Sequence, residues 1–279
     1  MTGARPLTGR VALITGSGRG IGRAHAMTLA RDGATVVVND LGTDLSGRGS
    51  DRDPARAVVQ AIVDAGGNAI ADTTDIASIE GGAAVVGAAI DRCGRIDIVV
   101  NNAGFAHGGG TIECPVEEEL DALMSVHFKA AVGTMSACLG PMRTQGFGRV
   151  INMVSEAALD DRFISGFGYA AAKAALWSLT LAASKEVAGT GVTVNAISPG
   201  ARTRMNEELL DANFREGASS DLDLDPMHVA AVAALLAREE SGDITGRVVH
   251  AAGGMVREYT TQRSSRSELV ARLQLGLVR

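Results

Sequence analysis

Short apolar runs alternate with longer segments of helical periodicity along most of the chain. The runs are rich in β-branched residues and end in glycine or a polar residue, as buried parallel strands do. The predicted strands are Val11–Thr15, Thr35–Asn39, Asn68–Asp72, Ile96–Asn101, Arg149–Val154, Val192–Ile197 and Arg247–Ala251. The predicted helices are Ile21–Ala30, Asp53–Ala65, Ile79–Asp91, Val116–Ala137, Tyr169–Ala188 and Pro226–Arg238, the last with Asp225 as its cap.

This alternation predicts an α/β fold in which a mostly parallel, doubly wound sheet carries helices on both faces. No Pro/Ser-rich linker and no internal repeat divides the chain, so we expect a single domain over residues 1–256. Within it, residues of about 203–225 are expected to form a lid over the substrate. Residues 257–279 are expected to form a polar, partly helical C-terminal tail.

Composition and charge narrow the class of protein. The net charge is −6 and no basic block is present, so nucleic acid is not an expected partner. The three cysteines show no paired ligand spacing, which argues against a metal site or a disulfide frame. We found no apolar signal core and no uncharged apolar run long enough to span a bilayer, and therefore expect a cytoplasmic protein without a membrane partner.

A glycine-rich segment joins the first predicted strand to the first predicted helix. It reads Gly16-Ser17-Gly18-Arg19-Gly20-Ile21-Gly22. Glycines allow a sharp turn and a close approach to a pyrophosphate, and the start of the helix offers free N–H groups. Taken alone, such a string is often only a tight turn.

Two further features favour a dinucleotide site. Asp40 ends the second predicted strand, where a carboxylate accepts hydrogen bonds from ribose hydroxyls and repels a 2′-phosphate. Arg19 could receive that phosphate, but a phosphate beside the carboxylate is strongly unfavourable, so we predict NAD rather than NADP. Asn101-Asn102-Ala103-Gly104 ends the fourth predicted strand, at the edge where open α/β sheets bind ligands.

Tyr169 and Lys173 form the candidate reactive pair. On a helix, positions i and i+4 face the same side. The unperturbed pKa of tyrosine is near ~10, and an adjacent ammonium or a nicotinamide cation would lower it. Such a pair is common on surface helices, so the spacing alone is weak evidence. Ser155 follows the strand Arg149–Val154 and could hydrogen-bond a substrate oxygen opposite the tyrosine.

The order of these motifs along alternating strands resembles the short-chain dehydrogenase/reductase family, over about residues 5–255. The resemblance implies a Rossmann-fold enzyme that moves a hydride between NAD and a secondary alcohol or ketone, without a metal. It implies that Tyr169 is the catalytic acid/base, that Lys173 binds the ribose and lowers the pKa of the tyrosine, and that Ser155 binds the substrate oxygen. The cofactor-binding residues that it implies are Gly16, Gly18, Arg19, Gly20, Ile21, Gly22, Asp40, Asp75, Ile76, Asn102, Ala103, Gly104, Tyr169, Lys173, Pro199, Gly200 and Thr203.

Two departures from the family pattern stand out. His127 occupies the position of an Asn that anchors a water leading to the lysine, and it is either a substitute in the proton relay or a packed histidine. The spacing from Ser155 to Tyr169 is one residue longer than the commonest family spacing, so we expect an altered loop between them.

Three segments bear on the identity of the substrate. Val36–Gly42, Val126–Lys129 and Pro199–Met205 resemble the (3R)-hydroxyacyl-CoA dehydrogenase unit of peroxisomal multifunctional enzymes and its stand-alone bacterial relatives. The alternatives are a hydroxysteroid or other bulky secondary-alcohol dehydrogenase, and a non-catalytic NAD-sensing protein.

Two expectations accompany the substrate hypotheses. Met205, Leu209, Leu210 and Phe214 form an apolar helix face, which is either a lid or an ordinary surface helix, and Arg202, Arg204 and Arg215 could meet CoA phosphates. The family resemblance also implies a homotetramer whose contact surfaces are the helices Val116–Ala137 and Tyr169–Ala188.

Overall fold

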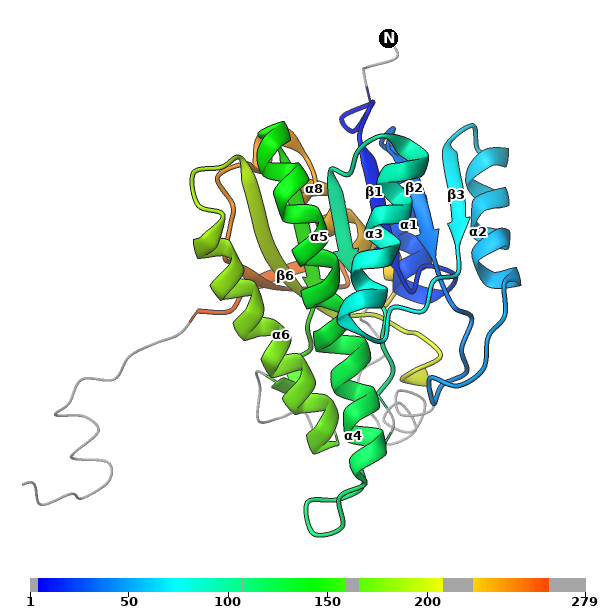
Figure 1. Cartoon of the computed structure of the whole chain (residues 1–279), viewed down its shortest axis with the longest axis vertical. Helices are drawn as coiled ribbons and strands as arrows, with labels where there is room; N and C mark the ends of the chain where they lie inside the picture. Colours follow the sequence, from blue (N-terminus) through cyan, green and yellow to red (C-terminus); the bar gives the residue numbers. More distant parts are fainter. Residues whose placement is uncertain (1–4, 107, 159–165, 208–222, 261–279) are drawn as a thin grey trace, which may run out of the picture.

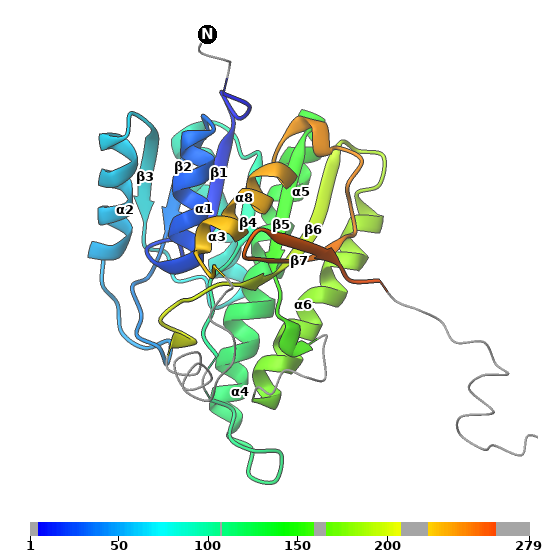
Figure 2. The ribbon, with the colours of Figure 1, turned by 180° about the vertical axis from the view of Figure 1, so that it is seen from behind.

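The computed structural model describes residues 5–106, 108–158, 166–207 and 223–260. They form a sheet of eight strands in the order β3-β2-β1-β4-β5-β6-β7-β8 (Figures 1 and 2). The strands are β1 (Val11–Thr15), β2 (Thr35–Asn39), β3 (Asn68–Asp72), β4 (Ile98–Asn101), β5 (Gly148–Met153), β6 (Val192–Gly200), β7 (Val248–Ala252) and β8 (Met255–Glu258). All neighbouring pairs are parallel except β7 and β8.

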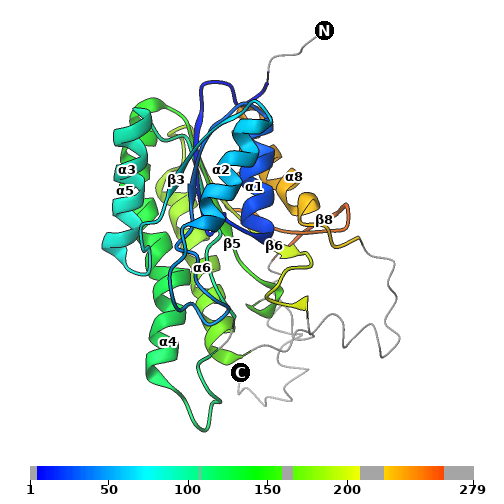
Figure 3. The same cartoon turned by 90° about the vertical axis from the view of Figure 1, so that its right-hand side faces the viewer.

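Helices cover both faces of this sheet, as Figure 3 shows from the side. One face carries α1 (Gly20–Arg31), α2 (Asp53–Asp64) and α8 (Pro226–Leu236), and the other carries α3 (Ile79–Cys93), α5 (Ala130–Gln145) and α6 (Phe167–Glu186). Successive residues of β1 enter opposite cores, Ala12 and Ile14 on the first face and Val11 and Leu13 on the second. The predicted doubly wound α/β fold is therefore confirmed.

The predicted long helix over Val116–Ala137 is divided into three segments. It consists of α4 (Glu117–Met124), a π-helical turn η1 (Ser125–Lys129) and α5. A π-turn adds a residue to the helix and is common at functional sites, and periodicity reading cannot detect it in a short segment. His127 lies at its centre.

The C-terminal boundary of the domain differs from the expected residue 256. Met255–Glu258 forms β8, which pairs antiparallel with β7, and the Tyr259 N–H donates to the Val248 carbonyl (2.8 Å). A four-residue strand that follows a tight Gly253-Gly254 turn has too few positions to show alternation. The remainder of the predicted tail, residues 261–279, lies outside the described residues.

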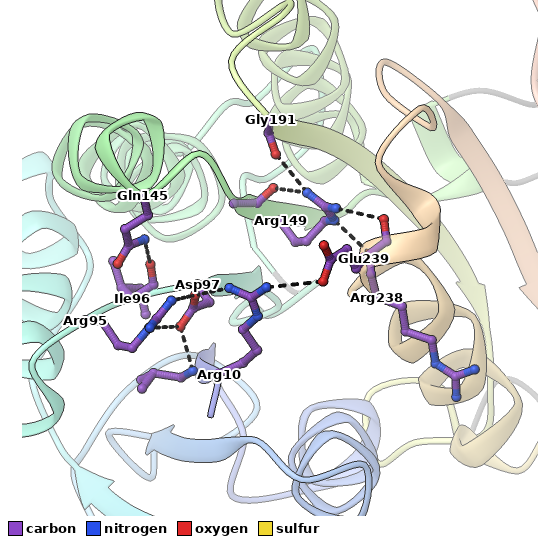
Figure 4. A network of polar contacts seen from close by, with 11 residues as sticks. Arg10, Arg95, Ile96, Asp97, Gln145, Arg149, Gly191, Arg238 and Glu239 are labelled. Atoms are coloured by element: carbon purple, nitrogen blue, oxygen red, sulfur yellow. Dashed lines mark hydrogen bonds and ion pairs between the residues drawn. The ribbon is translucent and has the colours of Figure 1, made fainter. Parts of the chain in front are cut away.

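Residues at the amino ends of the strands form a dense polar network (Figure 4). The Asp97 carboxylate, which is fully buried, accepts hydrogen bonds from Arg10, from Nε and Nη2 of Arg95 and from the Val11 N–H. Arg149 donates to the carbonyls of Gly148, Gly191, Arg238 and Glu239. This rim holds the starts of β1, β4, β5 and β6 together.

One helical stretch has membrane-like composition. Among the described helices, Glu117–Gln145 alone is long and apolar enough by length and composition to cross a membrane, whereas sequence reading found no such segment. Nearly half (44%) of its apolar window is buried inside the fold, and a core helix passes the same test. The expectation of no membrane partner stays a prediction.

Candidate active site

A cavity of about 840 Å³ opens at the carboxyl ends of the strands, where the strand order reverses between β1 and β4. This is the crevice in which open α/β sheets bind ligands. Of the sequence-predicted site residues, its lining includes Gly16, Arg19, Gly20, Ile21, Gly22, Asp40, Asp75, Ile76, Asn102, Ala103, Gly104, His127, Tyr169, Lys173, Pro199 and Thr203. The structure therefore brings together residues from both halves of the sheet.

The start of α1 is suited to an anion. Its N-cap residue, Arg19, provides no side-chain cap, so the first N–H groups of the helix lack the usual side-chain acceptor. Gly20 lines the cavity and has a positive φ of 53°. Exposed N–H groups and the helix dipole fit a pyrophosphate at this point, so the residues present suit a dinucleotide cofactor.

The Asn102-Ala103-Gly104 segment supports the glycine turn. Asn102 Nδ2 donates to the carbonyls of Thr15 (2.9 Å) and Gly16 (3.0 Å). The Thr15 hydroxyl accepts from the N–H groups of Asn102 and Ala103. A Cβ on Gly16 would lie 2.7 Å from the Ala103 Cα, so the two segments require small residues where they meet. Asn102 thus fixes the shape of the cavity floor.

Asp40 lies against the glycine turn. Its Oδ2 accepts from the Gly18 N–H (2.6 Å) and its Oδ1 from the Gly42 N–H (2.7 Å). Gly18 itself does not line the cavity, and its role is to orient this carboxylate. Arg19 extends away toward the Thr43 carbonyl (3.4 Å) and Asp51 (3.9 Å). The negative charge of Asp40 is therefore held at the expected adenosine end.

Tyr169 lies in the first turn of α6 with its ring edge-on to His127, at a centroid distance of 5.4 Å. Burial raises the pKa of Tyr169, and a hydrogen bond with Ser155 acts in the opposite direction. This hydrogen bond joins the two predicted groups despite their unusual spacing. The intervening residues 159–165 lie outside the described residues.

Lys173 is buried one turn further along α6. Its Nζ donates to the Met153 carbonyl (2.6 Å) and lies 5.6 Å from the centroid of the Tyr169 ring. Burial lowers the pKa of Lys173 to about 7. The amine is therefore near its titration point at neutral pH and can both release and take up a proton.

His127 is buried beside this pair. Its Nε2 lies 2.8 Å from the Phe105 carbonyl, and since a carbonyl only accepts, Nε2 carries the proton. Nδ1 is then an acceptor, and it has no hydrogen-bond partner among the described residues. Burial and the charge of Lys173 hold the pKa of His127 well below its usual value. A Cβ on Gly104 would collide with the ring at 2.0 Å, which explains the glycine at that position.

The remaining predicted residues divide into three groups. Ser155 and Gly200 lie outside the cavity lining, Ser155 directly after Val154 and Gly200 against Ala252 at the end of β6. The expected lid residues Leu209, Leu210, Phe214 and Arg215 lie outside the described residues. Met205 and Arg204 do line the cavity, and Arg204 donates to the Thr43 carbonyl (3.0 Å).

Sequence reasoning missed several lining residues. The β2–α2 loop over residues 41–48 borders the cavity, and Gly47 lies against the Phe105 ring, where a Cβ would meet it at 2.7 Å. Glu118 and Glu119 border the cavity from α4. The only sequence signal was the length and polarity of the loop, which does not show that it folds back over the cleft. Within the described segments, no group of three or more His, Cys, Asp or Glu could hold a metal ion.

Comparison with known proteins identifies the class. The sequence model of the short chain dehydrogenase family matches residues 10–213. Peroxisomal multifunctional enzyme type 2 of Drosophila melanogaster is 37% identical over 246 residues, which are 88% of this chain and 39% of the fly enzyme. Hydroxyacyl-CoA dehydrogenase ChsB1 of Mycobacterium tuberculosis is 34% identical over 88% of this chain and 78% of that protein. The crystal structure of a short chain dehydrogenase from Mycobacterium avium superposes with a TM-score of 0.79 at 36% identity, over 96% of this chain and 94% of that one.

These matches show that the chain belongs to the short-chain dehydrogenase/reductase family. The matched relatives are named as dehydrogenases, and the chain shares the fold of a solved short chain dehydrogenase. The chain spans between 28% and 55% of the length of the peroxisomal multifunctional relatives that it matches.

Proposed function

We propose that the protein interconverts a 3-hydroxyacyl-CoA and the corresponding 3-ketoacyl-CoA with NAD. The observation that carries this proposal is that the Tyr169–Lys173 pair and the uncapped start of α1 share one cavity. One end of the cavity suits a dinucleotide, and the other presents groups that exchange protons.

NAD is the cofactor favoured by the position of Asp40. Its carboxylate is fixed beside the glycine turn by two backbone N–H groups, so a 2′-phosphate placed there would meet a negative charge. Arg19, the residue that could offset this repulsion, points toward Thr43 and Asp51. Pro199 and Thr203, from the end of β6, are proposed to hold the nicotinamide end.

The protein's residues handle the proton in this reaction. The substrate oxygen lies between Ser155 and Tyr169, and Tyr169 removes its proton during oxidation or returns it during reduction. When bound, the oxidised nicotinamide supplies the hydride acceptor and a positive charge that favours the phenolate. Lys173, with a pKa of about 7, then exchanges the proton with its surroundings.

His127 is proposed to extend this relay. Its Nδ1 is buried, is free to accept a hydrogen bond among the described residues, and belongs to a ring close enough to Lys173 for their charges to interact. Nε2–H is committed to Phe105, which fixes the tautomer and leaves only Nδ1 for proton transfer. Substitution of His127 tests the alternative, in which the histidine only packs against its neighbours.

The acyl-CoA assignment rests on the relatives. Proteins named hydroxyacyl-CoA dehydrogenase and peroxisomal multifunctional enzyme type 2 match at 34% and 37% identity. A hydroxysteroid or another bulky secondary alcohol is the second candidate, since the cavity of about 840 Å³ leaves room for one. We also propose a homotetramer formed through α4, α5 and α6, to be tested by light scattering.

Formation of NADH with a panel of 3-hydroxyacyl-CoA thioesters and steroid alcohols tests the proposal. We expect turnover with acyl-CoA, and a preference for NAD over NADP that weakens in Asp40→Ala. Turnover with steroids alone would contradict the substrate assignment. Tight NAD binding without turnover of any alcohol would favour an NAD-sensing protein.

A further inference from the structure

A buried polar cluster lies directly behind Ser155. Glu156 follows this serine and begins the 3₁₀ turn η2 (Glu156–Ala158). Only 8% of Glu156 is exposed. Its Oε1 accepts from the Tyr259 hydroxyl (2.5 Å) and lies 3.3 Å from His250 Nδ1 and 3.5 Å from an Arg257 nitrogen. The proton transfer described above uses none of these four side chains.

The partners of Glu156 come from the C-terminal end of the described chain. His250 lies on β7 and Arg257 on β8, and Tyr259 follows β8 and is held by its N–H bond to the Val248 carbonyl. Tyr259 packs against the small core that contains Val154, Leu176 and Val248. The last strand is thereby connected to α6, which carries Tyr169 and Lys173, and to the turn that carries Ser155.

The backbone around Ser155 is held on both sides. On one side, Lys173 binds the Met153 carbonyl. On the other, the Ala157 N–H donates to Ser155 Oγ (3.2 Å) and the Ala158 N–H to the Ser155 carbonyl (3.1 Å). Because Oγ accepts from Ala157, its own proton is left to point toward Tyr169 or a substrate oxygen. The direction of the serine hydroxyl therefore depends on the turn that Glu156 begins.

We propose that Glu156 and Tyr259 are positioning residues of the active site: the Tyr259 hydroxyl holds the Glu156 carboxylate, and this contact fixes the 3₁₀ turn that aims the Ser155 hydroxyl. The inference rests on the proposed function of Ser155. It makes β8 and Tyr259, at the edge of the sheet, a part of the catalytic support. Burying a carboxylate is costly, and three polar groups converge on one oxygen of Glu156. Completing the sheet with β8 would require neither feature.

Two nearly isosteric substitutions test this role, Tyr259→Phe and Glu156→Gln. We expect each to lower kcat by about tenfold, the effect of losing a hydrogen bond to a charged group. The dissociation constant of NAD should stay near its wild-type value, because neither residue lines the cavity. Glu258→Gln is the matched control, since Glu258 ends β8 next to Tyr259 and makes an exposed ion pair with Arg247; its loss should leave kcat unchanged.

A second measurement is independent of turnover. The chain has two tyrosines, so in Tyr259→Phe the phenolate absorbance reports Tyr169 alone. The hydrogen bond with Ser155 lowers the pKa of Tyr169, whereas the nearby His127 and Lys173 are unchanged by these substitutions. In Tyr259→Phe, the proposal predicts that Ser155 no longer points at the phenol. Adding Glu156→Gln or Ser155→Ala to this variant should then leave the pKa of Tyr169 unchanged. A rise in that pKa on adding Ser155→Ala would show that Ser155 still points at the phenol.

The outcomes separate the two proposals. A fall in kcat with unchanged NAD affinity supports positioning, as does a pKa of Tyr169 in Tyr259→Phe that Ser155→Ala does not change. An unchanged kcat, or a kcat that falls together with NAD affinity, overturns it. If the wild-type protein turns over no alcohol of the panel, the proposed function fails, and the phenolate titration alone decides: a rise in the pKa of Tyr169 on adding Ser155→Ala to Tyr259→Phe overturns the positioning role.

Discussion

Buried polar groups at the two rims of the sheet differ in their hydrogen-bond partners. At the amino ends of the strands, the fully buried carboxylate of Asp97 accepts hydrogen bonds from two arginines and a backbone N–H. At the carboxyl ends, Lys173 makes one hydrogen bond to the backbone and His127 Nδ1 has no partner among the described residues. The buried charge at the amino rim therefore has several hydrogen-bond partners. The buried groups at the carboxyl rim remain able to accept or release protons.

The pKa values follow the same division. Burial lowers the pKa of Lys173 to about 7, lowers the pKa of His127 and raises that of Tyr169. In contrast, the partnered Asp97 raises the pKa of Arg95 through their hydrogen bond. Desolvation without a compensating partner destabilises the charged form, which costs stability but moves a side chain toward the pH at which it can transfer protons. We therefore expect substitutions at the carboxyl rim to alter rate and those at the amino rim to alter stability.

The largest effect is expected from Tyr169→Phe. This substitution removes the proton-transferring hydroxyl and keeps the ring that packs edge-on to His127. Turnover should fall by about 10³-fold or more, within the range for a lost general acid/base, while NAD affinity changes little. Steady-state kinetics and NAD titration by calorimetry measure both quantities. Residual turnover within tenfold of wild type would contradict the assignment.

Asp97→Ala should produce the largest loss of stability. It leaves the Val11 N–H and two arginines without their acceptor, and we expect the free energy of unfolding to fall by about 3 kcal/mol, near the lower end for a broken buried pair because both arginines are partly exposed. Urea denaturation measures it, with the exposed Asp91→Ala as control. The kcat of the folded variant should stay within about twofold. A large loss of kcat without a loss of stability would contradict the expectation that the amino rim contributes to stability rather than to rate.

Lys173 should give the cofactor-free protein a pH-dependent stability. Its pKa is about 7 in the folded state, against the ordinary lysine value of 10.5 that applies to the unfolded chain. Between these two limits the unfolded chain binds a proton that the folded chain does not. The free energy of unfolding should therefore rise with pH, by at most about 1.4 kcal/mol per pH unit.

Denaturation at several pH values between 7 and 8.5 measures this slope, below the range in which Cys138, whose pKa burial raises to about 12, ionises in the unfolded chain only. Lys173→Met should remove it, and the exposed Lys185→Met should not. His127 titrates below this window and Tyr169 above it, so neither obscures the result. Equal slopes in the two variants would show that Lys173 is charged in the folded protein.

His127→Asn should have the smallest effect. It restores the residue type usual in the family and removes the imidazole, so kcat should fall by less than about tenfold. If His127 relays the proton, the solvent deuterium isotope effect on kcat should increase in this variant. An unchanged isotope effect together with an unchanged kcat would show that the histidine only packs against Gly104 and Phe105.

Local patterns predicted most of the fold and of the cofactor end. The bounds of β1, β2 and β3 agree with the prediction because each is a short apolar or alternating run that ends at a polar residue. The cap of α8 was also predicted, and Asp225 accepts from the Met227 N–H. The π-turn around His127 and the short strand β8 were not predicted, because the first depends on packing between Gly104 and α6 and the second on pairing with β7.

The sequence by itself determined the order of strands and helices, the glycine turn and the Tyr169–Lys173 pair, because each is set by residues close together in the chain. Only the tertiary structure decided which groups are desolvated, which of them have partners, and that Tyr259 reaches Glu156 behind Ser155 across 103 positions of sequence. Burial and hydrogen bonding depend on neighbours from distant segments, and the reactivity of a side chain depends on both.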